Sequence, residues 1–303
     1  MATRTTIGEA GSKDPAESVV TGLSCPICDA AMPPAAHNWL YVCARCGFQR
    51  SSLRPRIEPG ALAALHQDPE RTALGSVRRA NFERILDLIS KHENVAGRRL
   101  LEVGGGYGWF LRSAEARRME TYAIDPDPRL TTTGGAARTL WRGYFPMDLP
   151  SVPPFDVIAF NDSFEHLPDV GQALAACFRL LNPGGILTIN APSSTGIFYR
   201  LGTLLDLFGI SGPLERLWQK DFPSPHLSYF APDQLSRLAE RHGFAEIERS
   251  TLKSVRLRGL WSRIRCDPKV SPVRAAILWL GSAVLIPFSA FLPDISLQLF
   301  RKR

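Results

Sequence analysis

Hydrophobic and polar positions along the chain follow two periods that alternate from residue 76 onward. Apolar side chains recur every three to four residues over 76–91, which predicts a helix with one buried face. Short apolar runs between the helical stretches predict buried strands. The predicted strands cover 98–103, 121–125, 154–162, 182–192 (after a turn) and 295–300, and the further predicted helices cover 109–118 and 165–181.

This alternation of strands and helices predicts a doubly wound α/β fold with a mostly parallel sheet. Ligands of such sheets bind at the carboxyl ends of the strands. Three polar stretches fall at those ends: Glu102–Gly108, Asp125 and Asn161–His166. We therefore expect the functional site to be built from these three stretches.

The first polar stretch reads E-V-G-G-G-Y-G. The dinucleotide fingerprint G-x-G-x-x-G does not fit, because its third glycine would fall on Trp109. A phosphate-binding P-loop is excluded as well, because no Gly-Lys-Ser/Thr follows. The pattern that does fit is an acid followed by alternate glycines, at Glu102, Gly104, Gly106 and Gly108. A purely structural strand-to-helix turn is the alternative.

The second polar position, Asp125, lies 23 residues after Glu102, one β-α-β step later. An acid at this place in a doubly wound sheet can accept hydrogen bonds from both ribose hydroxyls of a nucleoside. The spacing therefore favours a ligand that contains a ribose.

Composition changes this picture in one place. The chain has 303 residues, 45% hydrophobic and 21% charged, which is typical of a globular protein. Its net charge of +7 is local, because eight basic residues and one acid lie between Arg249 and Arg274 and the rest of the chain balances. Residues 1–22 are polar and lack the apolar run of a signal peptide, so we expect a disordered terminus on a cytoplasmic protein.

Four of the six cysteines form two C-x-x-C pairs, Cys25/Cys28 and Cys43/Cys46, separated by 14 residues. Such a spacing brings four thiolates to one tetrahedral centre, which suits Zn²⁺. Disulfides are disfavoured in a cytoplasmic chain. We therefore predict a small zinc ribbon over 23–52, closed by four cysteines and not catalytic, followed by a helical linker and first helix over 53–96.

Five motifs occur in order along the chain: E-V-G-G-G-Y-G (102–108), A-I-D (123–125), F-D-V-I-A-F-N-D-S-F-E-H-L-P-D (155–169), L-L-N-P-G-G-I-L-T-I-N-A-P (180–192) and H-L-S-Y-F-A-P-D-Q-L…G-F (226–244). They resemble those of the class I S-adenosylmethionine (SAM) methyltransferases, in the family's order. The last one is similar to a branch that includes quinone-biosynthesis-type O-methyltransferases and bacterial enzymes with an N-terminal zinc ribbon. The resemblance implies a Rossmann-like, seven-stranded sheet in a SAM-binding domain over 97–303. One departure is Gly105, where the family often has a larger residue.

The resemblance also implies which residues bind the cofactor. Asp125 would hold the ribose, Pro126 and Asp127 would flank the adenine, and Asp162 or Ser163 would line the methyl-transfer site. The full set of expected cofactor residues is Glu102, Gly104, Gly106, Gly108, Asp125, Pro126, Asp127 and Asn161.

A hydroxyl acceptor has to lose a proton when it attacks the methyl group. His166 is the preferred general base because its unperturbed pKa suits the task. The alternative is that the Glu165–His166 pair only caps the predicted helix or orders its loop. His226 is a second candidate for the base, and Asp162 is a further catalytic candidate. N-methylation of a base or glutamine is disfavoured, because N-D-S-F at 161–164 lacks both prolines of the N-P-P-Y motif.

Two apolar insertions interrupt the expected domain. Residues 196–222 are rich in Phe, Leu and Ile, and they form either a substrate lid or an amphipathic pair packed on the core. Residues 252–293 combine the basic patch with 19 uncharged residues, 275–293. A helix of that length spans about 28 Å, close to the bilayer thickness. Pro287 opposes a span, so we expect membrane docking without crossing; burial in the protein's own core is the alternative.

Three functions compete at this point. The first is O-methylation of a small, amphiphilic or lipid-linked acceptor such as a glycan, sugar or quinone precursor, at the inner face of the membrane. The second is an RNA- or nucleotide-modifying methyltransferase that grips phosphates with the ribbon and the arginine patch. Nucleic acid is the less expected partner, because only Trp261 interleaves with the cations. The third is a non-catalytic scaffold of the same fold. No oligomeric state follows from the sequence.

Overall fold

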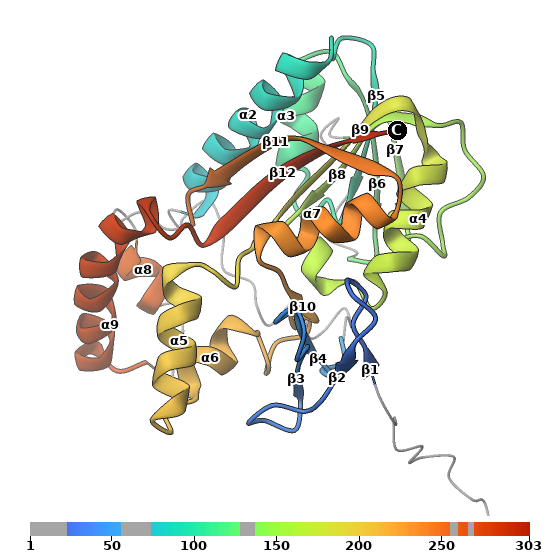
Figure 1. Cartoon of the computed structure of the whole chain (residues 1–303). Helices are drawn as coiled ribbons and strands as arrows, with labels where there is room; N and C mark the ends of the chain where they lie inside the picture. Colours follow the sequence, from blue (N-terminus) through green and yellow to red (C-terminus); the bar gives the residue numbers. More distant parts are fainter. Residues whose placement is uncertain (1–22, 56–73, 128–136, 255–259, 266–269) are drawn as a thin grey trace, which may run out of the picture.

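The computed structural model describes residues 23–55, 74–127, 137–254, 260–265 and 270–303 (Figure 1). The predicted disordered terminus, 1–22, and much of the predicted linker, 56–73, lie outside the described residues. Three of the eight basic residues, Arg256, Arg258 and Lys269, lie outside them too.

A seven-stranded sheet in the order β11-β12-β9-β8-β5-β6-β7 forms the centre of the molecule. Five adjacent strands, from β9 to β7, are parallel, while β12 is antiparallel to both of its neighbours. This confirms the predicted doubly wound, mostly parallel sheet and its final strand. The strands are β5 (Arg99–Val103), β6 (Glu120–Asp125), β7 (Thr139–Arg142), β8 (Phe155–Asn161), β9 (Leu181–Pro192), β11 (Phe244–Leu252) and β12 (Ile295–Lys302).

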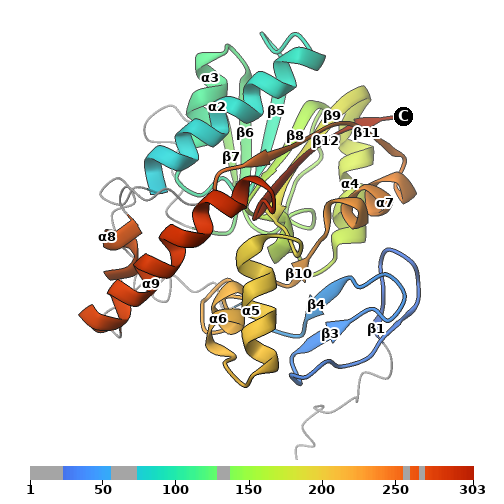
Figure 2. The same ribbon diagram turned by 60° about the vertical axis from the view of Figure 1, so that its left-hand side comes forward.

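Helices cover both faces of this sheet (Figures 1 and 2). Helices α2 (Leu74–His92) and α3 (Trp109–Ala116) lie on one face, and α4 (Val170–Leu180) and α7 (Pro232–Arg241) lie on the other. The apolar stripe predicted for the first helix is buried against the sheet, because it holds Phe82, Ile85, Leu86 and Ile89 at helical spacing.

The helix predicted over 165–181 is divided in two. Residues Phe164–His166 form a single 3₁₀ turn, η1, and α4 begins only at Val170. Pro168 disfavours helical backbone at the residue before it, and Asp169 caps α4 by accepting a hydrogen bond from the Gln172 amide at 2.8 Å. Glu165 and His166 therefore do not cap this helix.

The four-cysteine segment is joined to the main domain. Its strands are β1 (Leu23–Ser24), β2 (Ala31–Met32), β3 (Leu40–Val42) and β4 (Gln49–Ser51). Strand β4 pairs with β3 on one side and with β10 (Ser228–Tyr229) on the other. The ring of Phe48 packs 5.0 Å from that of Phe230. The segment therefore shares the hydrophobic core that covers one face of the sheet.

The first insertion forms α5 (Ile197–Leu207) and α6 (Gly212–Leu217), and the second forms α8 (Leu260–Arg265), α9 (Pro272–Leu285) and the 3₁₀ helix η2 (Ile286–Ala290). Helix α9 ends two residues before Pro287, as expected of a residue that breaks the hydrogen-bond ladder. Among the described helices, none is long and apolar enough to cross a membrane.

The two insertions lie side by side below the sheet in the views of Figures 1 and 2. The Ile197 amide donates to the Leu292 carbonyl at 3.1 Å, and the Phe198 amide donates to Asp294 at 2.9 Å. The inner face of the first insertion packs on the four-cysteine segment, since Tyr199, Leu214 and Trp218 form one buried cluster with Trp39.

Candidate functional site

The glycine loop leaves the carboxyl end of β5. Gly104, Gly106 and Gly108 have φ angles of +80°, +54° and +66°, which only glycine adopts without strain. A Cβ on Gly104 would lie 2.7 Å from the Cβ of Ser163, whereas a Cβ on Gly106 would meet nothing within 4 Å. The alternate glycines thus occupy the positions where the backbone is left-handed. The space beside Gly106 is open to a ligand.

Asp125 ends β6 and contacts this loop directly. Its Oδ2 accepts a hydrogen bond from the Gly106 amide at 2.9 Å, and its Oδ1 accepts one from the Asp127 amide at 2.7 Å. Burial raises the pKa of this carboxyl, although the two amide bonds oppose the shift. Each carboxylate oxygen carries a second lone pair, so Asp125 can hold the loop and still accept from a ligand.

Glu102 is the buried acid of the site. Its Oε1 accepts from the Asn161 side-chain amide at 2.8 Å, and Asn161 in turn accepts from Asn190 at 2.7 Å. Within the described residues Oε2 has no hydrogen-bond partner. Burial raises the pKa of Glu102 to about 8, the Asn161 bond opposes this, and the charge of Asp125 adds to it. A polar chain thus crosses the ends of β5, β8 and β9, and it contains a carboxylate that a cation would stabilise.

Asp162 follows β8 in a left-handed conformation, with φ of +51°. Its amide donates to Asn190 Oδ1 at 3.2 Å, and its carboxylate pairs with Arg78 of α2 at 3.3 Å. The neighbouring Ser163 donates to the Val103 carbonyl at 2.6 Å, which ties this turn to the glycine loop. Asp162 therefore lies beside the loop, as expected of a residue that lines the methyl-transfer site.

The two candidate histidines lie together. The rings of His166 and His226 are 4.8 Å apart, although 60 residues separate them in sequence. Burial lowers the pKa of His166 and lowers that of His226 well below its usual value. Both imidazoles are therefore neutral near pH 7, the form in which one ring nitrogen can accept a proton or bind a cation.

A family model described as a methyltransferase domain matches residues 75–248, which is more than half of the chain. The chain belongs to this family. The cofactor of this methyltransferase is accordingly SAM, and we predict that the glycine loop and Asp125 bind it.

Curated relatives include other methyltransferases. An uncharacterised methyltransferase of Mycobacterium marinum is 32% identical over 108 residues, 34% of this chain and 42% of its own length. A ubiquinone biosynthesis O-methyltransferase of Xylella fastidiosa is 31% identical over 118 residues, 36% of this chain and 48% of its own length. The chain thus spans less than half the length of these relatives.

A solved structure described as a sarcosine dimethylglycine methyltransferase of Galdieria sulphuraria has the same fold. Its TM-score is 0.52 at 19% identity, and the match covers 78% of this chain and 91% of the other. The likeness extends the methyltransferase fold beyond the part that the family model matches.

The four cysteines fit a metal site. The sulfur atoms of Cys25 and Cys46 lie 3.5 Å apart and those of Cys28 and Cys43 lie 3.4 Å apart, and all four lie within 4.8 Å of one another. A tetrahedron of Zn–S bonds has edges of about 3.8 Å, so small shifts would complete it. The amide of Cys46 donates to the sulfur of Cys43, as in a turn that surrounds thiolates. The geometry is compatible with the predicted zinc ribbon.

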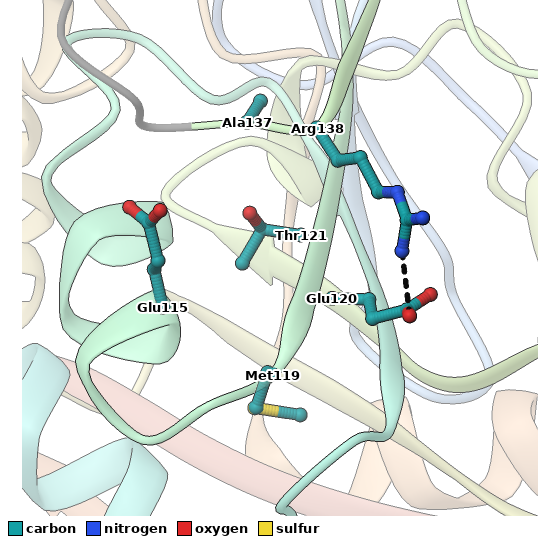
Figure 3. A pocket seen from close by; sticks show the side chains of 6 residues that line it. All are labelled: Glu115, Met119, Glu120, Thr121, Ala137 and Arg138. Atoms are coloured by element: carbon teal, nitrogen blue, oxygen red, sulfur yellow. Dashed lines mark ion pairs between the residues drawn. The ribbon is translucent and has the colours of Figure 1, made fainter.

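A separate hollow lies far from this chemistry. It is at the amino end of β6, whereas Asp125 is at the carboxyl end, and an ion pair of 2.6 Å between Arg138 and Glu120 crosses it (Figure 3). We assign it no part in the methyl transfer. Its lining residues are Glu115, Met119, Glu120, Thr121, Ala137 and Arg138.

Sequence reasoning missed three members of the site. Asn190 had a signal, because it ends a strand in one of the five motifs. Glu165 had one too, since it adjoins His166. Arg78 had none, because a cation on an amphipathic helix does not indicate which strand end it faces.

Proposed function

We propose that this methyltransferase transfers the methyl group of SAM to a hydroxyl of an amphiphilic or lipid-linked acceptor, which it meets at an anionic membrane surface. The observation that carries the proposal is the distribution of exposed hydrophobic side chains. Large hydrophobic residues are normally scattered over a protein surface, and here they are concentrated.

Twelve of the fifteen large hydrophobic side chains that are exposed in the described residues lie on the two insertions. The most exposed are Leu207 (77%), Phe208 (76%) and Phe291 (84%). Hydrogen bonds from Ile197 and Phe198 to Leu292 and Asp294 join the start of α5 to the segment after η2, so the two insertions that carry these side chains are in contact. The twelve are Leu204, Leu207, Phe208, Ile210, Trp261, Val273, Ile277, Leu278, Leu280, Val284, Phe288 and Phe291.

Basic residues adjoin this surface. Within the second insertion, Lys253 near its start and Arg265 at the end of α8 are exposed. Arg249 does not contribute, because it pairs with Glu246 at 2.6 Å and with Asp233 at 2.5 Å. A basic and apolar surface matches anionic headgroups above acyl chains, with about 1 kcal/mol for each cation near the membrane. This charge complementarity favours a membrane over a second copy of the chain.

Transfer to oxygen is supported by the neutral histidines and by the relatives named as ubiquinone biosynthesis O-methyltransferases. A neutral imidazole at the predicted transfer site can take up the hydroxyl proton. The proposal also includes one structural zinc ion, bound by the four cysteines.

Vesicle flotation tests the membrane part of the proposal. The protein should float with anionic vesicles, less at high salt, and only weakly with neutral ones. Leu207→Asp and Phe291→Asp should each lower the affinity about tenfold or more, because each removes an apolar side chain that the proposal buries in the membrane and puts a charge in its place. Met147→Asp is the matched control, since Met147 is 61% exposed but lies outside the insertions.

Two outcomes would refute the proposal. If the three variants float as well as the wild type, the apolar side chains of the insertions have no part in membrane binding. A concentration-dependent dimer that Phe291→Asp dissociates, together with no vesicle binding, would assign the surface to a second copy. Incubation of the enzyme with labelled SAM and a membrane lipid extract then tests the acceptor, and recovery of label only on nitrogen would exclude O-methylation.

A further inference from the structure

The two candidate histidines differ in their access to solvent. The side chain of His166 is 21% exposed, whereas that of His226 is 8% exposed. Their rings meet edge to face, with centroids 4.8 Å apart and an interplanar angle of 67°. Aromatic rings prefer this arrangement. His166 is thus the more accessible ring, and the buried ring of His226 packs against it.

Both ring nitrogens of His226 are already hydrogen-bonded. Nδ1 lies 3.3 Å from the Tyr229 hydroxyl, which itself donates to the Leu217 carbonyl at 3.0 Å. A hydroxyl has only one proton, so Nδ1 carries its own proton and donates to Tyr229. Nε2 is therefore the unprotonated nitrogen of the neutral ring, and the Gln219 side-chain amide, 2.9 Å away, donates to it. His226 cannot take up a proton unless Gln219 first moves away.

His166 keeps one nitrogen free. Its Nδ1 lies 2.9 Å from the Pro225 carbonyl, which can only accept, so Nδ1 carries the proton and donates. The Ser224 hydroxyl is 3.2 Å from the same nitrogen. Nε2 is therefore unprotonated, and Oε1 of Glu165, 3.9 Å away, is too far for a hydrogen bond. Within the described residues, no donor occupies the nitrogen that a base needs.

Residues 224–226 follow the first insertion directly and orient His166. Their backbone is fixed at the end of the segment, because the His226 amide donates to the Trp218 carbonyl at 3.0 Å and the Leu227 amide donates to the Glu165 carbonyl at 2.7 Å. Gln219 has a left-handed backbone with φ of +51°, which is strained for a residue with a side chain. Such strain persists where the surrounding contacts hold it, and it is commonest at functional sites.

We propose that His226 is a positioning residue and that His166 alone takes up the proton of the acceptor. Gln219 and Tyr229 hold the His226 ring, and this ring, together with the Pro225 carbonyl, fixes the direction of Nε2 of His166. The inference rests on the proposed O-methylation. Nε2 of His166 takes the hydroxyl proton, and the hydroxyl oxygen attacks the methyl carbon, forming the O–C bond as the C–S bond breaks and leaving a neutral thioether. The imidazolium then passes its proton to water.

The titratable groups around the two rings favour the same division. Oε1 of Glu165 lies 3.9 Å from Nε2 of each histidine, and burial raises the pKa of this carboxyl well above its usual value. Burial lowers the pKa of His166, while the Pro225 bond and the charge of Asp162 oppose this shift. Burial lowers the pKa of His226 well below its usual value, and the charge of His166 adds to the effect. The pKa of His166 should therefore be the higher of the two, which suits proton uptake near pH 7.

Nitrogen-15 NMR of the histidine rings tests the positioning without the acceptor. In the full-length protein, both histidines should carry their proton on Nδ1 at pH 7. Tyr229→Phe should remove this preference in His226 alone, because it removes the hydroxyl that accepts from Nδ1. Gln219→Met keeps the length of the side chain but removes the donor, so the titration midpoint of His226 should move to higher pH.

Tyr199→Phe is the matched control. Tyr199 belongs to the same buried cluster, with its ring 4.3 Å from that of Tyr229, but its hydroxyl donates to Gln49. The variant should leave both tautomers and both midpoints unchanged. Circular dichroism and SAM affinity show whether each variant is folded, and Gln219→Met, at a half-buried position, keeps the test informative if Tyr229→Phe is not.

The pH dependence of turnover, with labelled SAM and the membrane lipid extract, identifies the base. Gln219→Met and Tyr229→Phe should each lower kcat about tenfold or more at unchanged SAM affinity, because a displaced base slows the transfer. Both should keep the wild-type midpoint of the pH–rate profile, since His166 still takes the proton. A midpoint that Gln219→Met moves together with the titration of His226 would make His226 the base and overturn the inference.

The NMR experiment can overturn the inference as well. A wild-type His226 with its proton on Nε2 would do so, as would tautomers and midpoints that Tyr229→Phe and Gln219→Met leave unchanged. Failure of the proposed function is distinguishable. Label only on nitrogen, with the expected NMR results, would discard O-methylation and retain His226 as the residue that orients His166. Label on oxygen, with the proton of His226 on Nε2, would do the reverse.

Discussion

SAM binding should become tighter as the pH rises towards 8, and Glu102 should be the cause. SAM carries a positively charged sulfonium, so it favours the ionised form of a nearby carboxylate. In the free protein burial raises the pKa of Glu102 from 4.5 to about 8. At pH 7 the carboxyl is therefore mostly protonated, and SAM binding has to expel this proton.

The magnitude follows from this pKa. If only the ionised form binds, the dissociation constant rises about tenfold at pH 7 and about 100-fold at pH 6, relative to its value above pH 9. The stability of the free protein changes with pH in the opposite direction to its affinity for SAM. The native protein holds a proton that the unfolded chain releases above pH 4.5, so the free energy of unfolding decreases between pH 4.5 and about 8.

Isothermal titration calorimetry between pH 6 and 9, in buffers of different ionisation enthalpy, measures both the affinity and the proton release. Glu102→Gln should bind SAM with little pH dependence, because its amide carbonyl can still accept from Asn161 and cannot ionise. Glu120→Gln, at the opposite end of the neighbouring strand, is the control and should keep the wild-type slope. A flat wild-type profile, or an unchanged slope in Glu102→Gln, would refute the reasoning.

Three further predictions concern the cofactor, the acceptor and the metal. Asp125→Ala should weaken SAM binding by about 1.5–3 kcal/mol, because it removes a charged hydrogen-bond acceptor; unchanged calorimetry would exclude a ribose contact. His166→Gln should abolish turnover and change the SAM dissociation constant less than about threefold; retained turnover would return His166 to a structural role. The purified protein should carry zinc at the four cysteines, and Cys46→Ser should lose it and lower kcat while SAM still binds; metal analysis and kinetics check both, and a zinc-free active wild type would contradict the prediction.

Much of the fold could be predicted because its strands and helices differ in hydrophobic period. The alternate glycines were specific for the same reason: an acid and three glycines at fixed spacing describe a backbone with φ above zero, which the loop has. The boundary at 165–181 was wrong because the apolar pattern continues through Pro168, and a local break does not change the period. Strand β7 was not predicted, because T-L-W-R is short and lies at the edge of the sheet.

The site was only partly predictable, because its decisive contacts join distant segments. Sequence spacing indicated that Glu102, Asp125 and Asn161 share one edge of the sheet. It did not indicate that His226 would face Glu165, since that contact depends on how the chain returns after two helices of an insertion. The pairing of β4 with β10 was hidden for the same reason: 175 residues separate Ser51 from His226.

Through that pairing, the four-cysteine segment contacts the backbone near the two candidate histidines. Ser51 donates its amide to the Leu227 carbonyl at 3.0 Å and its hydroxyl to the His226 carbonyl at 2.8 Å. Arg50 donates to the Pro168 carbonyl at 2.8 Å, two residues beyond His166. Strand β4, which follows the fourth cysteine, therefore contacts the backbone of His226 and the backbone two residues after His166. A closed thiolate site does no chemistry of its own. Since β4 contacts the backbone at His226 and near His166, we expect loss of zinc to change the spacing of the two histidines and so to lower kcat.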